Sequence, residues 1–243
     1  AREDGDGFIL DGSKVFITNG AHACVTIVMA LTRKSPREIS AFLVEPGTKG
    51  FSVGKGERKM GLKGSDTVSL FFEECRVPKS AMLGAPGEGL KIALSALDGG
   101  RIGIACRAIG IARSARSTAT EYAWGRRKFG HAIGEFQAIQ WKLADAATEL
   151  DAAQLLAFRA ACLKEKGAPY SKEASMAKLF ATDMAMQVTV DAVQVMGGHG
   201  YMREYPVEKM MRDAKILQIY EGTNQIMRNV IGLALNKEYS KKK

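Results

Sequence analysis

The sequence predicts an α+β fold, in which an antiparallel β-domain portion precedes an antiparallel four-helix-bundle-type domain. Up to about residue 86, short β-branched apolar runs alternate with turn residues. After Gly87, proline occurs only at positions 169 and 206, and Ala, Leu, Met, Lys and Glu dominate. Apolar residues in this second part recur at steps of three and four, the period of one helix face. We therefore expect two domains, residues 1–86 and 87–243.

The strands are expected in the first part, in the following order. In "GFILDGSKVFITNG", two apolar runs flank Asp11-Gly12, a dipeptide typical of a β-hairpin. "CVTIVMAL" and "EISAFLVE" follow as β-branched strands on either side of the basic loop "TRKSPRE". "TVSLFFEECRVP" is a further strand, which Pro78 ends because proline cannot donate to a strand ladder.

The helices follow. A long helix is expected from Leu90 to Tyr122, with an interruption at Gly99-Gly100. Two further helices are predicted by apolar faces: Ile139, Leu143, Ala146, Leu150, Ala153, Ala157 and Ala160, and then Ala177, Ala181, Met184, Val188 and Val195. "VEKMMRDAKILQIY" after Pro206 and "TNQIMRNVIGLALNKEY" supply two more. Long helices with short connections imply an antiparallel bundle, and the terminal "KKK" is expected to be a frayed tail.

The composition narrows the function. No run approaches 18 uninterrupted apolar residues, so no membrane span is predicted. The four cysteines lack CxxC spacing and the chain has three histidines, so we expect no metal site and interpret the thiols as small buried groups in a reducing compartment. The net charge is +9. Because no zinc-finger or RNP pattern accompanies the charge, we favour a phosphate-bearing small ligand over nucleic acid.

Two glycine-containing segments are candidates for ligand binding. "WGRRKFG" places two arginines and a lysine at a joint between helices, which suits a phosphate because guanidinium groups bind its oxygens in pairs. The alternative is a solvated basic loop. In "QVMGGHGYMREYP", Gly197 and Gly198 end a helix and let a ligand approach the backbone, although a plain helix C-cap is an equal alternative. We interpret His199 as a surface-loop residue rather than a base.

Two further segments place charged side chains among apolar residues. "LDGGRIGIA" carries Asp98 and Arg101, which form either an internal ion pair or the hold on a polar ligand group. "QIYEGTNQI" carries Glu221 at a helix break between Tyr220 and Gly222. Apolar surroundings disfavour a charged carboxylate, which makes it a competent general base near neutral pH. A helix cap is the alternative role for Glu221.

Together these segments resemble the acyl-CoA dehydrogenase family. The resemblance runs over essentially the whole chain, through "DGSKVFITNGA", "FEECRVP", "LDGGRIGIA", "RRKFG", "FQAIQWKLADAATEL", "MAKLFATD", "QVMGGHGY", "VEKMMRDAKI" and "QIYEGTNQIMR". The order of these motifs is specific, and the short- and branched-chain bacterial members look closest. The resemblance implies the back part of the middle β-domain plus the C-terminal helical domain. The N-terminal helical domain and a serine- and threonine-rich flavin-binding segment of the family are not in this sequence.

The resemblance also implies a reaction, the FAD-dependent α,β-dehydrogenation of an acyl-CoA thioester to a trans-2-enoyl-CoA in fatty acid β-oxidation. Glu221 matches the base that removes the α-proton. Some subfamilies carry the base instead at the place that Gly100 occupies here. Asp98, Arg101, Tyr220 and Gly222 match the substrate site, where Gly222 lets the backbone crowd the thioester.

The cofactor implied by the resemblance is FAD. Phe16, Ile17 and Thr18 match the wall of the β-domain beside the flavin ring, and Thr223 and Gln225 match flavin contacts. Residues that match the hold on the FAD of a neighbouring subunit, chiefly its pyrophosphate and adenosine, are Arg126, Gln137, Gln194 and Gly198, and Phe129 and Gly197 are also assigned to the cofactor.

The implied partners are an acyl-CoA substrate, an electron-transferring flavoprotein as electron acceptor, and further copies of the chain in a dimer of dimers. The implied location is the bacterial cytoplasm or the mitochondrial matrix. Two alternatives stay open. An acyl-CoA oxidase would use the same base and pass electrons to oxygen. A non-catalytic oligomerisation fragment would keep the bundle without a complete flavin pocket.

Overall fold

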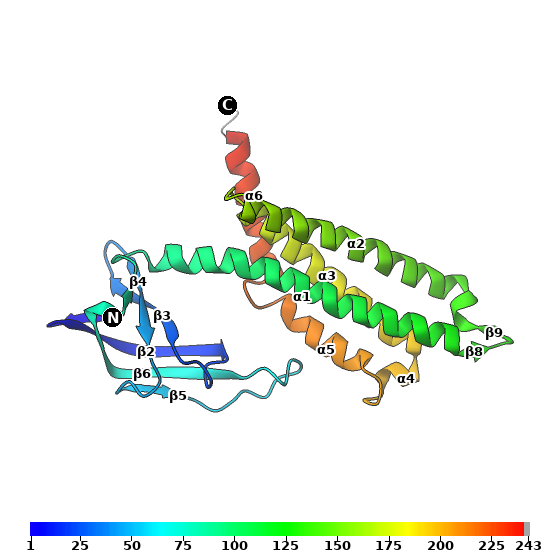
Figure 1. Cartoon of the computed structure of the whole chain (residues 1–243), viewed down its shortest axis with the longest axis horizontal. Coiled ribbons are helices and arrows are strands. Elements are labelled where there is room, and N and C mark those ends of the chain that lie inside the picture. The colour runs from blue at the N-terminus through cyan, green and yellow to red at the C-terminus, as the bar shows by residue number, and fades with distance from the viewer. Residues whose placement is uncertain (241–243) are drawn as a thin grey trace. The chain divides into compact units, whose positions relative to one another are not determined.

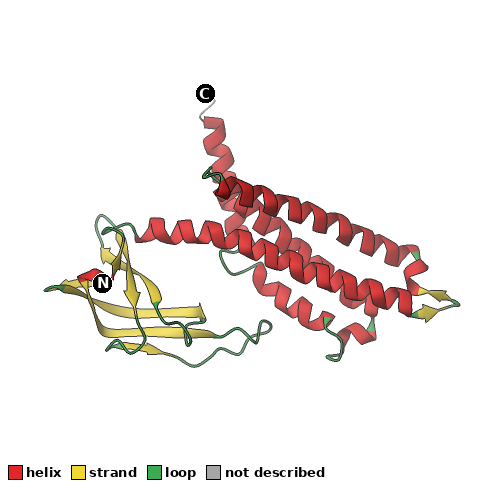
Figure 2. Cartoon of the chain, in the orientation of Figure 1, coloured by secondary structure: helices red, strands yellow, loops and turns green. Residues whose placement is uncertain are grey.

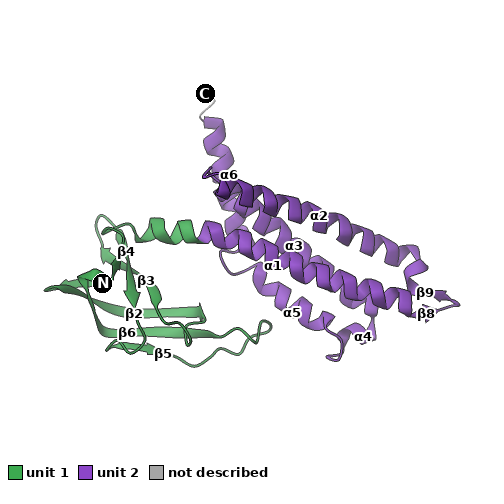
Figure 3. Ribbon diagram, viewed as in Figure 1, with its two compact units in different colours: residues 1–96 green, residues 97–243 purple. Residues whose placement is uncertain are grey.

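The computed structural model describes residues 1–240, and the predicted frayed tail at 241–243 lies outside the described residues. The chain divides into two compact units, residues 1–96 and 97–243 (Figure 3). Strands are the main regular structure of the first unit, and long helices make up most of the second (Figure 2). The predicted α+β fold class is therefore confirmed. The domain boundary predicted at residue 86 stays a prediction.

The first unit contains two antiparallel sheets rather than one (Figure 1). One has the strand order β1–β2–β6–β5 and the other the order β3–β4–β7. The strands are β1 (Arg2–Asp4), β2 (Gly7–Thr18), β3 (Thr26–Arg33), β4 (Glu38–Val44), β5 (Phe51–Val53), β6 (Thr67–Pro78) and β7 (Met82–Leu83), with a 3-10 turn η1 (Lys79–Ala81) before β7. The three strands predicted after Gly20 are confirmed as β3, β4 and β6.

The hairpin predicted at Asp11-Gly12 is wrong, because β2 runs straight through it. The pairing of β2 with β6 shifts register between Leu10 and Gly12, and Gly12 has a φ of 139°. The Asp11 carboxylate accepts a hydrogen bond from the backbone N–H of Glu74 on β6 at 2.7 Å. The dipeptide thus forms a β-bulge inside a long strand, where its unusual backbone is held by the neighbouring strand.

Residues from both sheets form one core in the first unit. The rings of Phe8 on β2 and Phe42 on β4 lie 5.1 Å apart. The buried members are Phe8, Leu10, Val28, Phe42, Val44, Val68, Leu70, Phe72, Cys75 and Val77. Only Cys75 fits the prediction of buried thiols, which is wrong for Cys24, Cys106 and Cys162 because these are exposed.

The second unit is a bundle of antiparallel helices, into which the first long helix continues from the first unit (Figure 1). The helices are α1 (Gly89–Gly125), α2 (Gln137–Glu165), α3 (Ser171–Met196), α4 (Gly198–Tyr201), α5 (Val207–Leu217) and α6 (Asn224–Ser240). Between α1 and α2 lie the two-residue strands β8 (Arg127–Lys128) and β9 (His131–Ala132) and a 3-10 turn η2 (Ile133–Glu135). Across residues 1–240, no helix has the length and apolar content that a membrane span needs.

The predicted helix faces lie in the bundle core. All five residues predicted on the face of α3 are buried, and so are the five from Ala146 to Ala160 on α2, whereas Ile139 and Leu143 at the start of the α2 face are only partly buried. Most of these side chains are alanine, which lets α2 and α3 pack closely along their length. The three- and four-residue spacing was therefore a sound guide to the buried side of each helix.

The interruption predicted at Gly99-Gly100 is wrong, since α1 is continuous from Gly89 to Gly125. The glycine pair instead serves close approach from outside the helix. A Cβ atom at Gly99 would lie 3.1 Å from Nζ of Lys164, and one at Gly100 would lie 2.7 Å from Oε2 of Glu221. Glycine is tolerated here because two charged side chains reach the helix surface at these positions.

Candidate active site

The loop between α5 and α6 carries Glu221 in a strained conformation. Glu221 has a φ of +56° and Gly222 a φ of +93°, so two consecutive residues are left-handed. For a glutamate this region costs about 1–2 kcal/mol, whereas glycine has no Cβ to clash. The N–H of Asn224 donates to the carbonyl of Gln218 at 3.0 Å and closes the loop. Strain of this kind persists only where the surroundings hold it.

The Glu221 carboxylate points at α1. The Cβ position of Gly100 lies 2.7 Å from Oε2 and 3.3 Å from Cδ of Glu221. The Cβ position of Gly222 lies 3.8 Å from a terminal nitrogen of Arg101, one residue further along α1. The loop therefore holds a carboxylate directly over a glycine of α1, and its Gly222 lies beside the guanidinium group of Arg101.

Arg101 and Asp98 form an ion pair next to this carboxylate. Nη1 of Arg101 donates to Oδ1 of Asp98 at 2.7 Å, and the hydroxyl of Ser171 donates to the same oxygen at 2.9 Å. Arg101 is buried, with 5% of its surface exposed. The internal ion pair that the sequence suggested is present, and it is built into the wall beside Glu221.

Two buried polar atoms at this site are left over. Within residues 1–240, Nε of Arg101 and the hydroxyl of Tyr220 are buried without a hydrogen bond of good geometry, although the Arg107 side chain lies close to the Tyr220 hydroxyl. Burial raises the pKa of Tyr220, and the positive charge of Arg107 opposes the rise. Buried polar groups are nearly always paired in folded proteins, so such atoms suit a ligand that brings its own polar groups.

A buried lysine lies behind the loop, and sequence reasoning missed it. Lys178 on α3 is completely buried, and its Nζ donates to the carbonyl of Gly222 and to Oδ1 of Asn224, both at 2.8 Å. Burial lowers the pKa of Lys178 from 10.5 to about 8; Asp183 and Glu221 oppose this and Arg101 adds to it. The signal was available, because position 178 lies four residues after Ala174 and three before Ala181, on the buried stripe of α3.

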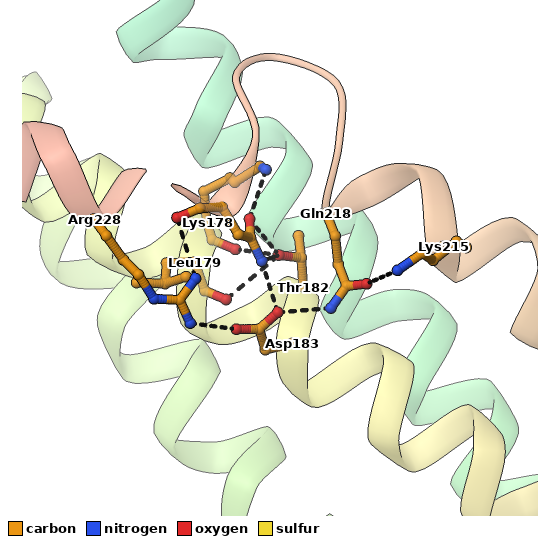
Figure 4. A network of polar contacts seen from close by, with 8 residues as sticks. Lys178, Leu179, Thr182, Asp183, Lys215, Gln218 and Arg228 are labelled. Carbon is orange, nitrogen blue, oxygen red and sulfur yellow. Dashed lines mark hydrogen bonds and ion pairs between the residues drawn. The ribbon is translucent and has the colours of Figure 1, made fainter. Parts of the chain in front are cut away.

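Figure 4 shows that this lysine belongs to a network joining α3, the loop and α6. The side-chain amide of Asn224 donates to Thr182 at 2.9 Å and to Asp183 at 2.7 Å. Asp183 also accepts from Gln218 at 2.6 Å and from Arg228 at 3.2 Å. Both ends of the Glu221 loop are therefore attached to α3.

The helix-cap alternative for Glu221 is not what the structure shows. α6 begins at Asn224, and the hydroxyl of Thr223 accepts a hydrogen bond from the N–H of Ile226 at 3.3 Å. Thr223 is therefore the capping residue. The apolar neighbours Ile219 and Ile226 are 48% and 46% exposed, so Glu221 has fewer buried apolar neighbours than its place in the sequence suggests.

Thr223 and Gln225, the two predicted flavin contacts near Glu221, face an open pocket. Its volume is about 330 Å³. The lining residues are Asp183, Lys215, Gln218, Ile219, Thr223, Asn224, Gln225 and Arg228. The pocket thus borders the network that holds the loop, and its polar lining suits a ligand rich in hydrogen-bonding groups.

The predicted flavin-wall residues Phe16, Ile17 and Thr18 lie at the end of β2 in the first unit. The pairing of β2 with β6 shifts register between Lys14 and Ile17, and Phe16 has a φ of +57°. Its side chain is 73% exposed. A bulge of this kind turns a side chain out of the sheet, which presents Phe16 on the surface of that unit.

The remaining predicted cofactor residues lie at the far end of α1 from Gly100. Gly100 and Gly125 are separated by 25 residues of continuous helix, a length of about 38 Å. The hydroxyl of Tyr122 and Nδ1 of His199 lie 2.9 Å apart, which joins this end of α1 to α4. Residues at this end are Arg126, Phe129, Gln137, Gln194, Gly197 and Gly198.

These residues occupy the joints between helices. Phe129 forms the turn between β8 and β9 with 91% of its surface exposed, Gln137 opens α2, and Gln194 lies in the last turn of α3. Gly197 ends α3 with a φ of +58°, as the sequence predicted. The exposed joints present amide and guanidinium groups outward, which is the arrangement that an external ligand needs.

Arg126 and Arg127, the two arginines of the basic joint "WGRRKFG" between α1 and α2, differ in their hydrogen bonds. Arg127 donates to the carbonyl of Gly130 at 2.7 Å inside the hairpin. Arg126 is exposed and pairs with no carboxylate in the part of the chain that the structure describes. An exposed guanidinium without an internal partner is the better ligand for a phosphate.

Two protein-family models match the chain. "Acyl-CoA dehydrogenase, middle domain" matches residues 1–75, and "Acyl-CoA dehydrogenase, C-terminal domain" matches residues 87–235. The short-chain specific acyl-CoA dehydrogenase of Megasphaera elsdenii is 50% identical over 97% of this chain and 62% of that protein. Relatives of similar identity include mitochondrial short-chain enzymes of mammals.

Solved structures match equally well. Butyryl-CoA dehydrogenase from Megasphaera elsdenii is 49% identical, with a TM-score of 0.95 over 96% of this chain and 62% of that chain. A chain from a structural study of the electron transferring flavoprotein of Acidaminococcus fermentans is 54% identical, with a TM-score of 0.95 and the same coverage. The present chain thus spans about three fifths of the length of the proteins it matches.

Proposed function

The chain belongs to the acyl-CoA dehydrogenase family, and from this premise we propose that it is the base-carrying and flavin-binding part of an FAD-dependent acyl-CoA dehydrogenase. The reaction removes one hydrogen from the α-carbon and one from the β-carbon of an acyl-CoA thioester to give a trans-2-enoyl-CoA. The names of the short-chain and butyryl-CoA relatives support a short acyl chain. The observation that carries the proposal is the Glu221 carboxylate held over Gly100.

Glu221 acts as the general base. Its carboxylate takes the α-proton and becomes a carboxylic acid, while the electron pair of the broken C–H bond moves toward the thioester carbonyl. No acceptor within residues 1–240 pairs with the backbone N–H of Glu221, which leaves this donor for the thioester oxygen. A donor aimed at that oxygen stabilises the negative charge that develops as the proton leaves.

When bound, FAD would supply the acceptor for the β-hydrogen, which would leave as a hydride. The residues present suit this cofactor. Arg126 offers the pyrophosphate a guanidinium group that is unpaired within the described part of the chain, and Gln137 and Gln194 offer amides at neighbouring helix ends. Thr223 and Gln225 line the polar pocket beside the Glu221 loop. In the first unit, Phe16, Ile17 and Thr18 form the surface that we assign to the flavin ring.

The length of α1 supports a homo-oligomer. About 38 Å of helix separates the Glu221 contact from the Arg126 joint, so the two groups of one chain belong to two different FAD sites. A second copy must then bring its own Arg126 joint to each Glu221. Large exposed apolar side chains on α2, Trp141, Leu155 and Phe158, support a surface that a further copy covers. We propose a dimer of dimers.

The electron acceptor in this proposal is an electron-transferring flavoprotein, and the location is the bacterial cytoplasm or the mitochondrial matrix. Support for the acceptor comes from the structural neighbour described with such a flavoprotein. An acyl-CoA oxidase would share every feature of the Glu221 site. Exposure of the reduced protein to oxygen separates the two, since an oxidase becomes reoxidised quickly.

The experiment is an absorbance spectrum of the full-length protein, followed by anaerobic addition of butyryl-CoA. We expect a yellow protein whose flavin absorbance bleaches as the thioester is oxidised. A colourless full-length oligomer would favour the non-catalytic alternative. A yellow protein that no saturated acyl-CoA bleaches would contradict the proposed reaction.

A further inference from the structure

The Glu221 loop needs an external restraint. A glutamate in the left-handed region relaxes toward ordinary φ values unless its neighbours prevent it. Such a rotation would turn the Glu221 carboxylate away from Gly100. Backbone bonds close the loop at Asn224 but leave the peptide groups of Glu221 and Gly222 without backbone partners in the described chain. The restraint on this peptide must therefore come from a side chain.

Lys178 is the side chain in that position. Its Nζ donates to the Gly222 carbonyl at 2.8 Å, and within residues 1–240 no other side chain donates to the backbone of residues 219–223. The second acceptor of Nζ, the side chain of Asn224, is itself bonded to Thr182 and Asp183. The lysine is thus held on α3 while it holds the loop.

Burying a lysine at position 178 is energetically unfavourable. Its side chain is completely buried, and lysine is almost never found there unless it is paired. A methionine would fill a similar volume without removing a charge from water. The charged groups that face Nζ are Asp183 on its own helix, Arg101 on α1 and Glu221 on the loop. What an apolar residue could not supply is the pair of hydrogen bonds from Nζ to the Gly222 carbonyl and to the Asn224 side chain.

We infer that Lys178 is a positioning residue for Glu221, because its buried ammonium group fixes the Gly222 carbonyl and thereby the backbone that aims the carboxylate at α1. This inference rests on the proposed function of Glu221 as the base. Loss of the ammonium leaves the Gly222 carbonyl without its donor, and the Glu221 peptide becomes free to rotate. Proton removal then slows because the carboxylate spends less time at the reacting carbon.

The test uses the full-length holoenzyme with three variants. Lys178→Met removes the ammonium and keeps the length of the side chain, and Lys178→Arg keeps the charge and the donors. Lys172→Met is the matched control, since Lys172 lies on the same helix and forms an ion pair with Glu238 away from the loop. Stopped-flow bleaching of the flavin by butyryl-CoA gives the limiting rate and the dissociation constant separately.

We expect Lys178→Met to lower the limiting rate about 100-fold, the loss that follows a misplacement of about 1 Å, with little change in the dissociation constant. Lys178→Arg should restore part of the rate, and Lys172→Met should leave both constants unchanged. A Lys178→Met limiting rate equal to the wild type, in a holoenzyme that Glu221→Gln inactivates, would overturn the inference and leave the proposed function intact.

Two further measurements test the inference if the protein does not oxidise acyl-CoA or if Lys178→Met does not fold. Hydrogen exchange of the present chain should be faster in the peptide 218–224 of Lys178→Met than in wild type, whether or not the protein oxidises acyl-CoA. Equal exchange would refute the hold on the loop. If Lys178→Met does not fold, the wild-type limiting rate decides. It should fall above pH 8, where Lys178 loses its proton and becomes a weaker donor, and a flat profile above that pH would contradict the inference.

Discussion

The Glu221 carboxylate fills the space that a side chain at Gly100 would need, since a Cβ atom on the glycine would lie 2.7 Å from Oε2 of the glutamate. The contact joins the first long helix of the bundle to a loop 121 residues later in the chain. It explains why a glycine pair lies inside an unbroken helix. A substitution at position 100 can therefore displace the carboxylate while Glu221 itself stays unchanged.

Gly100→Ala should separate stability from activity. Alanine in a helix interior is favoured over glycine by about 1 kcal/mol, so the helix gains stability. The new methyl group displaces the Glu221 carboxylate, and flavin reduction in the full-length enzyme should slow by at least about 10-fold. Gly110→Ala is the control, because a Cβ atom there would have no described atom outside its own helix backbone within 4 Å. Equal reduction rates in both variants would show that the carboxylate need not lie over Gly100.

The two arginines of the basic joint should differ in their effect on flavin content. Arg126→Ala removes an exposed guanidinium that has no carboxylate partner among residues 1–240, and the loss of a charged hydrogen bond should weaken FAD binding by about 1.5–3 kcal/mol. Arg127→Ala removes a side chain that bonds Gly130 inside its own hairpin, so it should weaken FAD less. Flavin content measured by absorbance after dialysis checks the difference, and equal content in the two variants would argue against Arg126.

Mixed oligomers should test whether two chains share each site. Arg126→Ala and Glu221→Gln should each give an enzyme that is inactive or depleted of flavin. If every FAD lies between the Arg126 joint of one chain and the Glu221 of another, a mixed pair contains one intact site. Co-expression of the two variants should then restore about half of the sites in each mixed pair. Activity no greater than that of the separate variants would place both residues in the same chain's site.

The stability of the protein should rise with pH around Lys178. Burial lowers the pKa of this lysine to about 8 from its usual 10.5. Below pH 8 both the folded and the unfolded chain carry the charge. Between pH 8 and 10.5 the folded chain has lost this proton while the unfolded chain still carries it. The free energy of unfolding therefore rises with pH in this range, by about 3 kcal/mol in total.

The comparison that isolates this effect is the difference in unfolding free energy between wild type and Lys178→Met, measured by denaturant titration at several pH values. The difference should shift in favour of wild type as the pH rises from 8 to 10.5. The rate of flavin reduction should fall over the lower part of the same range. A difference that stays constant with pH would mean that Lys178 titrates normally.

Regular spacing made much of the fold predictable from the sequence. The faces of α2 and α3 follow from three- and four-residue steps of small apolar residues, because packing against a neighbour requires them on one side. Asp11-Gly12 and Gly99-Gly100 misled the same reasoning. Each is a local signal for a turn or a break, and each is overruled by a distant partner, Glu74 for the first and Glu221 for the second.

The site was predictable only in part. Asp98, Arg101 and Glu221 stood out as charges among apolar residues, and the structure brings them together against α1. Lys178 was missed because one lysine in an alanine-rich helix resembles a solvated residue until its place on the buried stripe is counted. Its role depends on the carbonyl of Gly222, and a backbone atom carries no signal in a sequence.

Flavin reduction by Glu221→Gln tests the central claim most directly. The amide has nearly the size of the carboxylate but cannot accept the α-proton, so the full-length variant should fold, bind FAD and bind butyryl-CoA. Stopped-flow bleaching should then be slower than in wild type by at least about 100- to 10,000-fold, the usual contribution of a general base. Bleaching at close to the wild-type rate would contradict the account and show that the base lies elsewhere.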